Sequence, residues 1–322
     1  MPPQVATRLT PANRDAIAAA ARVLADGRLV AFPTETVYGL GADATNGEAV
    51  ARLYAAKGRP RFNPLIAHVA DAHAASSLGQ FSDHAKLLAT AFWPGPLTLV
   101  LPKADGCPVS ELATAGLDSI AVRVPDHPIA RDLLRAFGKP IVAPSANQSG
   151  HVSPTTAQHV LADLNGRVDL IVDGGPTSVG IESTIVSCLN VPTLLRPGGV
   201  PREAIERVLG HVLLDAAPSS DEAPLAPGML ASHYAPKTPL RLNAVDVRED
   251  EAVLAFGGDI PNAARMLNLS PAGDLVEAAA NLFSHLRALD SFGAREIAVM
   301  PIPTEGLGEA INDRLARGAA PK

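Results

Sequence analysis

Short apolar runs rich in β-branched residues alternate with helix-periodic segments over the first 210 residues. Such runs, bounded by Pro, Asp or Lys, predict strands at 29–32, 65–69, 97–101, 120–124, 141–143, 170–172, 183–187 and 193–195. The helical period predicts helices at 48–57, 84–92, 129–137 and 201–209, where Gly58 ends the first helix and Pro201 opens the last. This rhythm indicates an α/β domain with a mixed sheet.

The pattern changes after residue 210. Residues 215–239 are rich in proline and show little periodicity, which is typical of an extended linker. Beyond them, strands are predicted at 252–256 and 296–300, and helices at 275–289 and 307–315. The sequence therefore predicts three parts: an α/β domain at 10–210, a linker at 211–239 and a small second α/β domain at 240–322.

The distribution of charge limits the classes of ligand. Residues 1–210 contain 18 basic and 18 acidic side chains, whereas residues 211–322 contain 9 and 15, so the net charge of −6 lies in the last third. Nonspecific nucleic-acid binding needs a surplus of Lys and Arg, and stacking on bases needs aromatic residues, which make up only 4% here. A general RNA-binding surface is not expected, but a local cationic site is compatible with a neutral first domain.

Cysteine usage and hydropathy indicate the compartment. Cys107 and Cys188 have no metal-ligand spacing and do not form a closely spaced pair, which suits a reducing cytoplasm rather than a disulfide scaffold or zinc site. No run approaches the roughly 20 apolar residues that span a bilayer, and the first residues lack the apolar core of a signal peptide. We expect a cytoplasmic protein without a membrane partner.

The densest polar cluster is Lys57–Pro64, which places three cations within five residues at the end of a predicted helix. On spacing alone, a solvated helix terminus is the favoured interpretation, because Lys and Arg there complement the helix dipole. The prolines stiffen this segment, however, and fixed cationic groups are what a polyphosphate requires. A phosphate-binding site is the alternative hypothesis.

Three further features lie in or beside predicted strands. Pro144–Gly150 follows the strand at 141–143, and polar residues at the exit of a parallel-type strand often mark a ligand crevice; a local Asx or Ser turn is an equal alternative. Arg123 lies within an apolar run, so a small-molecule carboxylate or an internal acid should pair with it. His68 lies in a similar run, where a satisfied core histidine is the simpler interpretation.

Common nucleotide and hydrolase motifs are missing. The sequence contains no G-x-x-x-x-G-K-[ST] loop, no G-x-G-x-x-G after a strand, no H-E-x-x-H and no G-x-S-x-G. Any use of ATP would therefore need a different phosphate-binding geometry.

Several segments, in their order along the chain, resemble the YrdC-like family. The first-domain segments are Phe32–Gly41, Lys57-x-Arg59, Asn63–Ile66, Trp93–Thr98, Arg123-x-Pro125 and Ser145-x-Asn147. The segments that resemble the long, two-domain form of the family are His233–Pro236, Gly306–Gly308 and Ala310–Leu315. Each segment is short, but together they cover most of the chain.

The resemblance implies a fold and a reaction. The expected fold is a twisted mixed α/β sheet around a deep cationic cavity, followed by a small Rossmann-like C-terminal domain. The expected activity is that of an L-threonylcarbamoyladenylate synthase, a nucleotidyltransferase that converts L-threonine, bicarbonate and ATP to threonylcarbamoyl-AMP and pyrophosphate. The product would supply a threonylcarbamoyl-transferase complex that modifies the adenosine next to the anticodon of certain tRNAs. Stable direct tRNA binding by this chain is not expected.

The resemblance also implies roles for individual residues. The family's basic and polar catalytic tetrad corresponds to Lys57, Arg59, Ser145 and Asn147. Contacts to ATP are implied for Arg59, Asn63, Ser119, Ser145, Ser153, Arg196 and the linker residue Tyr234. The residues implied to surround threonine are Thr36, His68, Arg123 and Ser183, with Arg123 on the carboxylate.

The implied mechanism asks little covalent chemistry of the protein. Threonine would first become an N-carboxy species, whose carboxylate attacks the α-phosphate of ATP. Catalysis would then consist of positioning and charge stabilisation by Lys57 and Arg59, with Mg²⁺ bound to the phosphates and no metal ligand from the protein. No side chain stands out as a general base, and no organic cofactor is expected.

Two rival functions and one role of the linker are also considered. A carbamoyl-adenylate enzyme of another pathway is the alternative within the fold, although two cysteines are too few for the zinc fingers of hydrogenase-maturation relatives. A non-catalytic RNA-binding module is the alternative from another class. The linker, which carries Tyr234, is predicted to fold over the cavity as a lid that protects a mixed anhydride from water.

Overall fold

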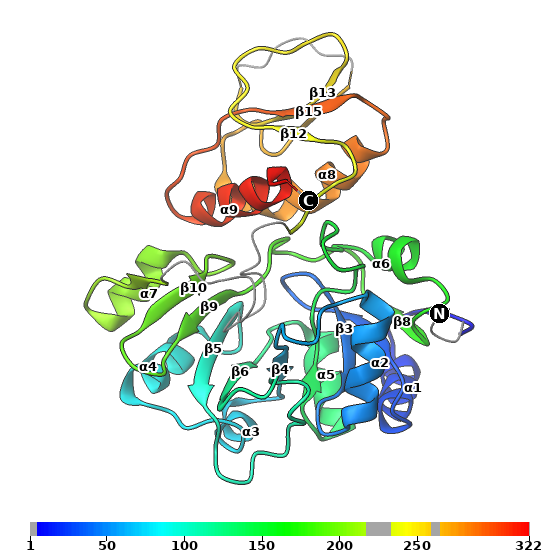
Figure 1. Cartoon of the computed structure of the whole chain (residues 1–322), viewed down its shortest axis with the longest axis vertical. Coiled ribbons are helices and arrows are strands. Elements are labelled where there is room, and N and C mark those ends of the chain that lie inside the picture. Colours follow the sequence, from blue (N-terminus) through cyan, green and yellow to red (C-terminus); the bar gives the residue numbers. More distant parts are fainter. Residues whose placement is uncertain (1–4, 217–232, 259–264, 322) are drawn as a thin grey trace.

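The computed structural model describes residues 5–216, 233–258 and 265–321. Two α/β domains lie one above the other along the long axis of the molecule (Figure 1). The middle of the predicted linker, at 217–232, lies outside the described residues. Within the described part of the chain, no helix combines the length and apolar character needed to cross a bilayer.

The first domain is built on one mixed sheet, as predicted. Its eleven strands run in the order β1-β8-β2-β3-β7-β4-β6-β5-β9-β10-β11, with both parallel and antiparallel pairs. The strands are β1 (Arg8–Pro11), β2 (Val30–Pro33), β3 (Tyr38–Asp43), β4 (Ile66–His68), β5 (Leu97–Pro102), β6 (Ser119–Arg123), β7 (Ile141–Val142), β8 (Leu170–Asp173), β9 (Thr184–Ser187), β10 (Thr193–Arg196) and β11 (Leu214–Asp215). One expectation is wrong, because β7 pairs antiparallel with both β3 and β4 and is not a parallel-type strand.

Helices cover this sheet, and their ends follow local capping chemistry. The helices are α1 (Arg14–Ala25), α2 (Gly47–Lys57), α3 (Ala72–Ser76), α4 (Asp83–Phe92), α5 (Pro128–Phe137), α6 (Ala157–Leu164) and α7 (Arg202–Leu209). The Asn46 side chain caps the start of α2, and Gly58, with a φ of 62°, ends it in the left-handed region, as predicted. Pro201 is the N-cap of α7 rather than a residue of its first turn.

Six elements of the first domain were not predicted from the sequence: strands β1, β3 and β11 and helices α1, α3 and α6. Strand β3 shows why. The sequence of β3, YGLGAD, contains two glycines, which are poor strand formers, yet all six residues are buried. A Cβ at Gly41 would lie 2.8 Å from the Phe32 ring, so the glycine allows β3 to pack beside β2. The glycines of β3 are therefore explained by close packing in the tertiary structure, and the local sequence pattern does not predict this strand.

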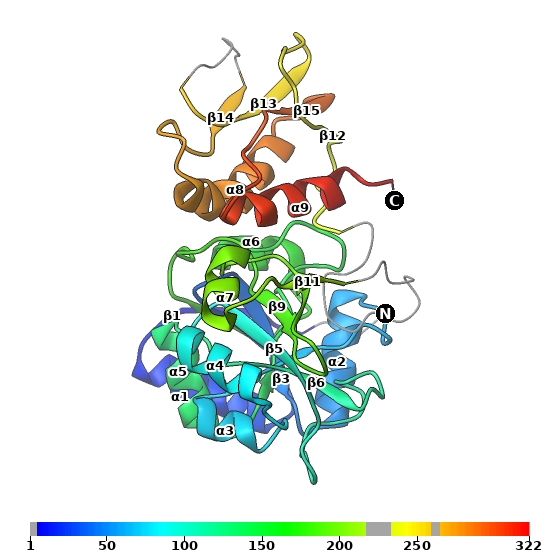
Figure 2. The ribbon, with the colours of Figure 1, turned by 90° about the vertical axis from the view of Figure 1, so that its left-hand side faces the viewer.

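The second domain has a four-stranded parallel sheet in the order β12-β15-β13-β14. Its elements are β12 (Leu240–Arg241), β13 (Glu251–Ala255), β14 (Met266–Asn268), α8 (Leu275–Asp290), β15 (Glu296–Val299) and α9 (Leu307–Ala319). Both helices lie between this sheet and the first domain (Figure 2). The strands and helices predicted here are confirmed to within a few residues.

A shared hydrophobic cluster joins the two domains. Val37, Val152 and Ile181 of the first domain are buried in the same cluster as Tyr234 of the linker and Phe283 of α8. The backbones approach closely at Gly180, where a Cβ would lie 2.4 Å from the Ala279 carbonyl oxygen in α8. The domains are therefore packed through a continuous core.

Replacing Gly180 should show how much this contact contributes to stability. Gly180→Ala combines a left-handed backbone with a collision against α8, whereas Gly175→Ala, in the same loop, has a similar φ and no atom within 4 Å of the new Cβ. We expect Gly175→Ala to cost about 1 kcal/mol, and Gly180→Ala to cost a further 1–3 kcal/mol, roughly, from overpacking. Urea unfolding measures both, and equal costs would contradict the tight interface.

Candidate active site

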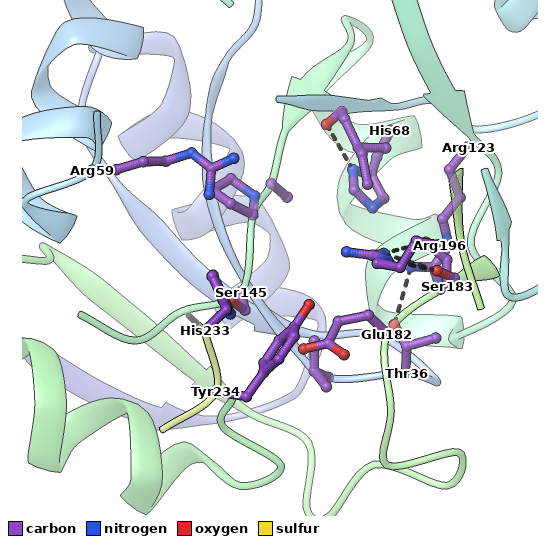
Figure 3. A pocket seen from close by; sticks show the side chains of 14 residues that line it. Thr36, Arg59, His68, Arg123, Ser145, Glu182, Ser183, Arg196, His233 and Tyr234 are labelled. Atoms are coloured by element: carbon purple, nitrogen blue, oxygen red, sulfur yellow. Dashed lines mark hydrogen bonds between the residues drawn. The ribbon is translucent and has the colours of Figure 1, made fainter. Parts of the chain in front are cut away.

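A small cavity lies in the first domain beneath the linker (Figure 3). About 50 Å³ of free space remains in it, which is room for only a few water molecules. Strands β4, β6 and β10 end at the cavity with His68, Arg123 and Arg196, and Ser183 directly precedes β9. Because β6 runs parallel to β4 and β10 runs antiparallel to β9, the strand directions bring these residues to one end of the sheet.

Arg123 is held in place by an internal acid. Its Nη2 donates to Glu35 Oε1 at 2.6 Å, Nη1 donates to Thr36 Oγ1 at 3.0 Å, and Nε donates to the Gly95 carbonyl at 3.3 Å. Both charged side chains of this pair are buried. The internal partner considered for Arg123 is therefore present, and it leaves two of the five guanidinium N–H groups without a hydrogen bond in the described residues.

Arg59 comes from the cationic segment after α2 and reaches the same cavity. Its Nη2 donates to Asn63 Oδ1 at 2.6 Å and to the Pro64 carbonyl at 3.0 Å, so the turn after α2 holds the guanidinium. Burial lowers the pKa of Arg59 to about 10, which leaves it charged at neutral pH. The segment is thus not a solvated helix end at Arg59, although Arg61, two residues on, is exposed.

Arg196 is the third guanidinium in the cavity lining. Its Nε and Nη2 donate to the Ser183 carbonyl at 3.1 and 2.8 Å, and Nη2 also contacts the Ser183 hydroxyl at 3.2 Å. That hydroxyl in turn lies 2.8 Å from Thr98 Oγ1. These contacts with Ser183 fix the direction of the Arg196 guanidinium.

Lys57 serves the cavity indirectly. Its Nζ donates to the carbonyl oxygens of Ser145 at 2.5 Å and Asn147 at 2.6 Å, which ties the end of α2 to the loop after β7. Burial lowers the pKa of Lys57 well below its ordinary value, and Arg59 lowers it further. The lysine thus holds the loop that presents Ser145 to the cavity.

His68 is an uncharged donor and acceptor within the lining. Its Nδ1 lies 3.2 Å from the Ile66 carbonyl, an arrangement that assigns the proton to Nδ1 and leaves Nε2 as an acceptor. Burial, assisted by the nearby Arg123, lowers the pKa of His68 to about 3. The ring is therefore neutral throughout the physiological range.

Glu182 lines the cavity, and sequence reasoning missed it. Its carboxylate accepts hydrogen bonds from the Ser153 hydroxyl and from Arg314 Nε of α9, the latter at 2.8 Å. Burial alone would raise the pKa of Glu182, but Arg314, Arg196 and the Ser153 hydrogen bond bring it below its ordinary value. An isolated acid in a glycine-rich loop gives no sequence signal, and its partner lies 132 residues away.

The linker forms one wall of the cavity. Tyr234 projects between the Arg59 side and the Glu182 side (Figure 3). Its ring stacks on Phe283 with centroids 5.8 Å apart and faces the Arg314 guanidinium at 4.9 Å. The neighbouring amides donate to Arg317 and Gly150 carbonyls, so the second domain and the first domain both hold this segment.

Most of the expected site residues converge on this cavity. The lining includes Thr36, Arg59, His68, Arg123, Ser145, Ser183, Arg196 and Tyr234. Lys57, Asn63, Asn147 and Ser153 lie behind it and contact the lining or its loop. Ser119 lies at the opposite end of β6 from Arg123, about 13 Å away at the usual rise per residue.

This lining defines a class of protein. Three buried guanidinium groups line the cavity together with hydroxyl groups and the imidazoles of two histidines. Carboxylate and phosphate groups are the ligands that such fixed guanidinium groups bind best. The fold and this lining define a two-domain α/β protein with an enclosed cavity whose chemistry suits a small anionic ligand.

Comparison with known proteins identifies the family. A family model for Sua5, YciO and YrdC, described as "Telomere recombination", matches residues 22–198, and one described as "Threonylcarbamoyl-AMP synthase, C-terminal domain" matches residues 200–320. The threonylcarbamoyl-AMP synthase of Bacillus subtilis is 44% identical over 95% of this chain and 94% of its own length. That of Pyrococcus abyssi is 42% identical over 93% of each. The chain belongs to the long, two-domain form of the Sua5/YrdC family.

Solved structures agree with this assignment. The crystal structure of P. abyssi Sua5 complexed with L-threonine has a TM-score of 0.88 and 39% identity, and the match covers 97% of each chain. Escherichia coli YciO, at 21% identity and a TM-score of 0.52, matches 60% of this chain and shows the fold alone. The expected YrdC-like fold with an added C-terminal domain is confirmed.

The protonation state of His68 can be tested by measuring how the free energy of unfolding depends on pH. The unfolded chain binds a proton at this residue below about pH 6.5, whereas the folded protein does so only near pH 3. The free energy of unfolding should therefore fall as the pH drops from 6.5 toward 3, by about 1.4 kcal/mol per unit from this group. Urea unfolding from pH 7 to 5 measures the slope.

His68→Gln should lose this contribution, so its stability should fall less steeply with acidification than that of the wild type. His73→Gln, at an exposed histidine of α3, is the matched control and should keep the wild-type slope. Parallel slopes for His68→Gln and wild type would show that the buried ring takes up a proton in the folded protein.

Proposed function

We propose that this chain is a threonylcarbamoyl-AMP synthase that joins L-threonine, bicarbonate and ATP in the cavity and releases pyrophosphate. The observation that carries the proposal is the convergence of the residues implied by the family resemblance on one buried, arginine-lined cavity. Its near full-length similarity to synthases from two domains of life supports the same reaction. Because these relatives are named as synthases and one of them shares the fold, a non-catalytic RNA-binding module is the weaker explanation.

Threonine occupies the side of the cavity at the end of β6. Its carboxylate binds the two N–H groups of Arg123 that the pairing with Glu35 leaves available. The neutral His68 accepts a hydrogen bond through Nε2, and Thr36 and Ser183 add hydroxyl groups. Glu35 fixes the direction of the guanidinium, so the amino acid meets a prearranged site.

ATP occupies the side lined by Arg59, Ser145 and Arg196. These guanidinium groups are held by Asn63 and by Ser183, and fixed cations stabilise phosphate charge without reorganising during the reaction. Ser153 acts through Glu182, and Tyr234 covers the nucleotide. Ser119, at the far end of β6, would contact a different part of the nucleotide from the phosphate-binding arginines.

The reaction follows from this placement. Bicarbonate takes up a proton and loses water to give carbon dioxide. The ammonium group of threonine loses a proton, its nitrogen bonds to the carbon of carbon dioxide, and loss of a second proton from nitrogen gives an N-carboxylate. An oxygen of this group attacks the α-phosphorus, and the bond to the β-phosphate breaks as pyrophosphate leaves. Arg59 and Arg196 stabilise the charge that builds on the phosphates, while Lys57 and Asn147 hold the loop that carries Ser145.

The acids around the cavity are compatible with Mg²⁺ bound through ATP. Glu35 and Glu182 are each paired with an arginine, and the described residues contain no cluster of three or more His, Cys, Asp or Glu side chains suited to a metal. The ion would therefore be held by phosphate oxygens and water. When bound, it supplies neutralisation of the triphosphate charge.

The linker acts as the lid of this site. Tyr234 and His233 form part of the cavity wall and leave space for only a few waters, so ligands enter when this segment moves. Closure then excludes water from the mixed anhydride product. Truncation after Gly210 would also uncover Val37, Val152 and Ile181, so a point substitution tests the lid more cleanly.

The product has its use in tRNA modification. A separate threonylcarbamoyl-transferase complex would take the adenylate and modify the adenosine next to the anticodon, so this chain needs no stable tRNA complex of its own. We place the reaction in the cytoplasm, in keeping with two free cysteines.

Charge removal within one short segment tests the phosphate site. Arg59→Ala should lower kcat/KM for ATP by about 10²-fold or more, because it removes a fixed cation from the reacting phosphates. Arg61→Ala removes the same charge two residues away, at an exposed position, and should stay near the wild-type value. Pyrophosphate release with threonine and bicarbonate present measures both; equal activities would contradict the site.

Tyr234→Ala tests the lid. Loss of the ring should raise threonine-independent ATP hydrolysis severalfold and lower the yield of threonylcarbamoyl-AMP per ATP consumed, because water gains access to the cavity. Tyr234→Phe keeps the ring between Phe283 and Arg314 and should retain wild-type coupling. Unchanged coupling in Tyr234→Ala would refute the lid.

A further inference from the structure

Three ion pairs join the two domains within the described residues: Arg202–Glu309, Arg287–Asp163 and Arg314–Glu182. The third differs from the other two, because the side chain of Arg314 is fully buried and its partner Glu182 lines the ligand cavity. A buried charge is retained only with strong compensation, since desolvation is costly. We therefore expect the Arg314–Glu182 pair to have a role in the ligand site in addition to holding the domains together.

Arg314 contacts three parts of the site at once. Nε donates to Glu182 at 2.8 Å, Nη2 donates to the carbonyl of Pro197, next to Arg196, at 2.9 Å, and the guanidinium faces the Tyr234 ring. Its Nη1 donates to Asp313 at 2.5 Å, so Arg314 keeps one acidic partner outside the cavity. A single side chain of the second domain thus touches the acid, the strand end and the lid.

Without Arg314, the negative charge of Glu182 would weaken ATP binding in this cavity. The carboxylate lies in the same lining as Arg59 and Arg196, and its negative charge would repel phosphate and attract the cation that phosphate needs. Arg314, which is not among the lining residues, pairs with Glu182 and compensates its charge.

We propose that Arg314 is a positioning residue through which the C-terminal domain sets the charge of the ATP site, by neutralising Glu182 and holding it together with the lid residue Tyr234. This inference rests on the proposed binding of ATP in the cavity. It assigns a role in the reaction to a domain none of whose described residues, from 240 onward, lines the cavity.

The test is a double-mutant cycle on the full-length chain. Arg314→Met should weaken binding of α,β-methylene-ATP and raise KM for ATP, each by about tenfold or more, because it leaves an uncompensated carboxylate in the cavity. Glu182→Gln in the same chain removes that charge and should restore both values to within about threefold of wild type. Glu309→Gln removes the charge from the partly buried Arg202 pair on the same helix and is the matched control, with ATP binding unchanged.

The pH dependence separates a charge effect from a loss of shape. In Arg314→Met, Glu182 loses the partner that lowers its pKa, so acidification should protonate it and reduce the defect in ATP affinity relative to wild type. If Arg314→Met does not fold, Arg314→Lys tests the charge effect instead. Because lysine retains the positive charge, its KM for ATP should stay within about threefold of the wild-type value.

Three results would overturn the inference: wild-type ATP affinity in Arg314→Met, a double variant no better than the single one, or a tenfold rise of KM in Arg314→Lys. A wild-type chain that fails to bind the nucleotide analogue would instead contradict the proposed function. Binding by wild type, lost in Arg59→Ala but kept in Arg314→Met, would contradict this inference alone.

Discussion

Burial of several like charges in one cavity is the constraint on which the rest of the structure depends. Arg59, Arg123 and Arg196 lie within the same lining, and each would repel the others strongly in a poorly polarisable interior. The fold meets this constraint with three kinds of partner: an acid for Arg123, carbonyl and amide oxygens for Arg59, and a serine for Arg196. Among the described lining residues, these three guanidinium groups outnumber the single carboxylate, that of Glu182, which gives the cavity the positive character that carboxylate and phosphate ligands need.

The same constraint explains why two domains meet here. The linker and the helices of the second domain cover the cavity and exclude solvent, which strengthens every charge interaction inside it. That cover also buries Glu182, which then needs the second domain's Arg314. Gly180 lets the loop before Glu182 approach α8 closely, so one loop carries both the tight packing against the second domain and the acid that pairs with Arg314 of α9.

The sequence predicted the parts of the molecule that depend on local chemistry. Most strands and helices followed from β-branched runs, helical periods and caps such as Gly58, and the unusual position of Arg123 was visible in an apolar strand. The glycine-containing strand β3, the antiparallel direction of β7 and the Arg314–Glu182 pair depend on tertiary contacts, and no local pattern specifies them. The assignment of site residues depended on family resemblance, since spacing alone left Lys57–Pro64 as a solvated helix end.

The central claim is that one cavity couples an amino acid, bicarbonate and ATP. Incubation of the full-length chain with ¹⁴C-bicarbonate, measured together with pyrophosphate release, tests it most directly. The account predicts labelled threonylcarbamoyl-AMP that requires both threonine and ATP, formed in equal amount with pyrophosphate. Pyrophosphate release that is independent of threonine, or an adenylate without the label, would contradict it.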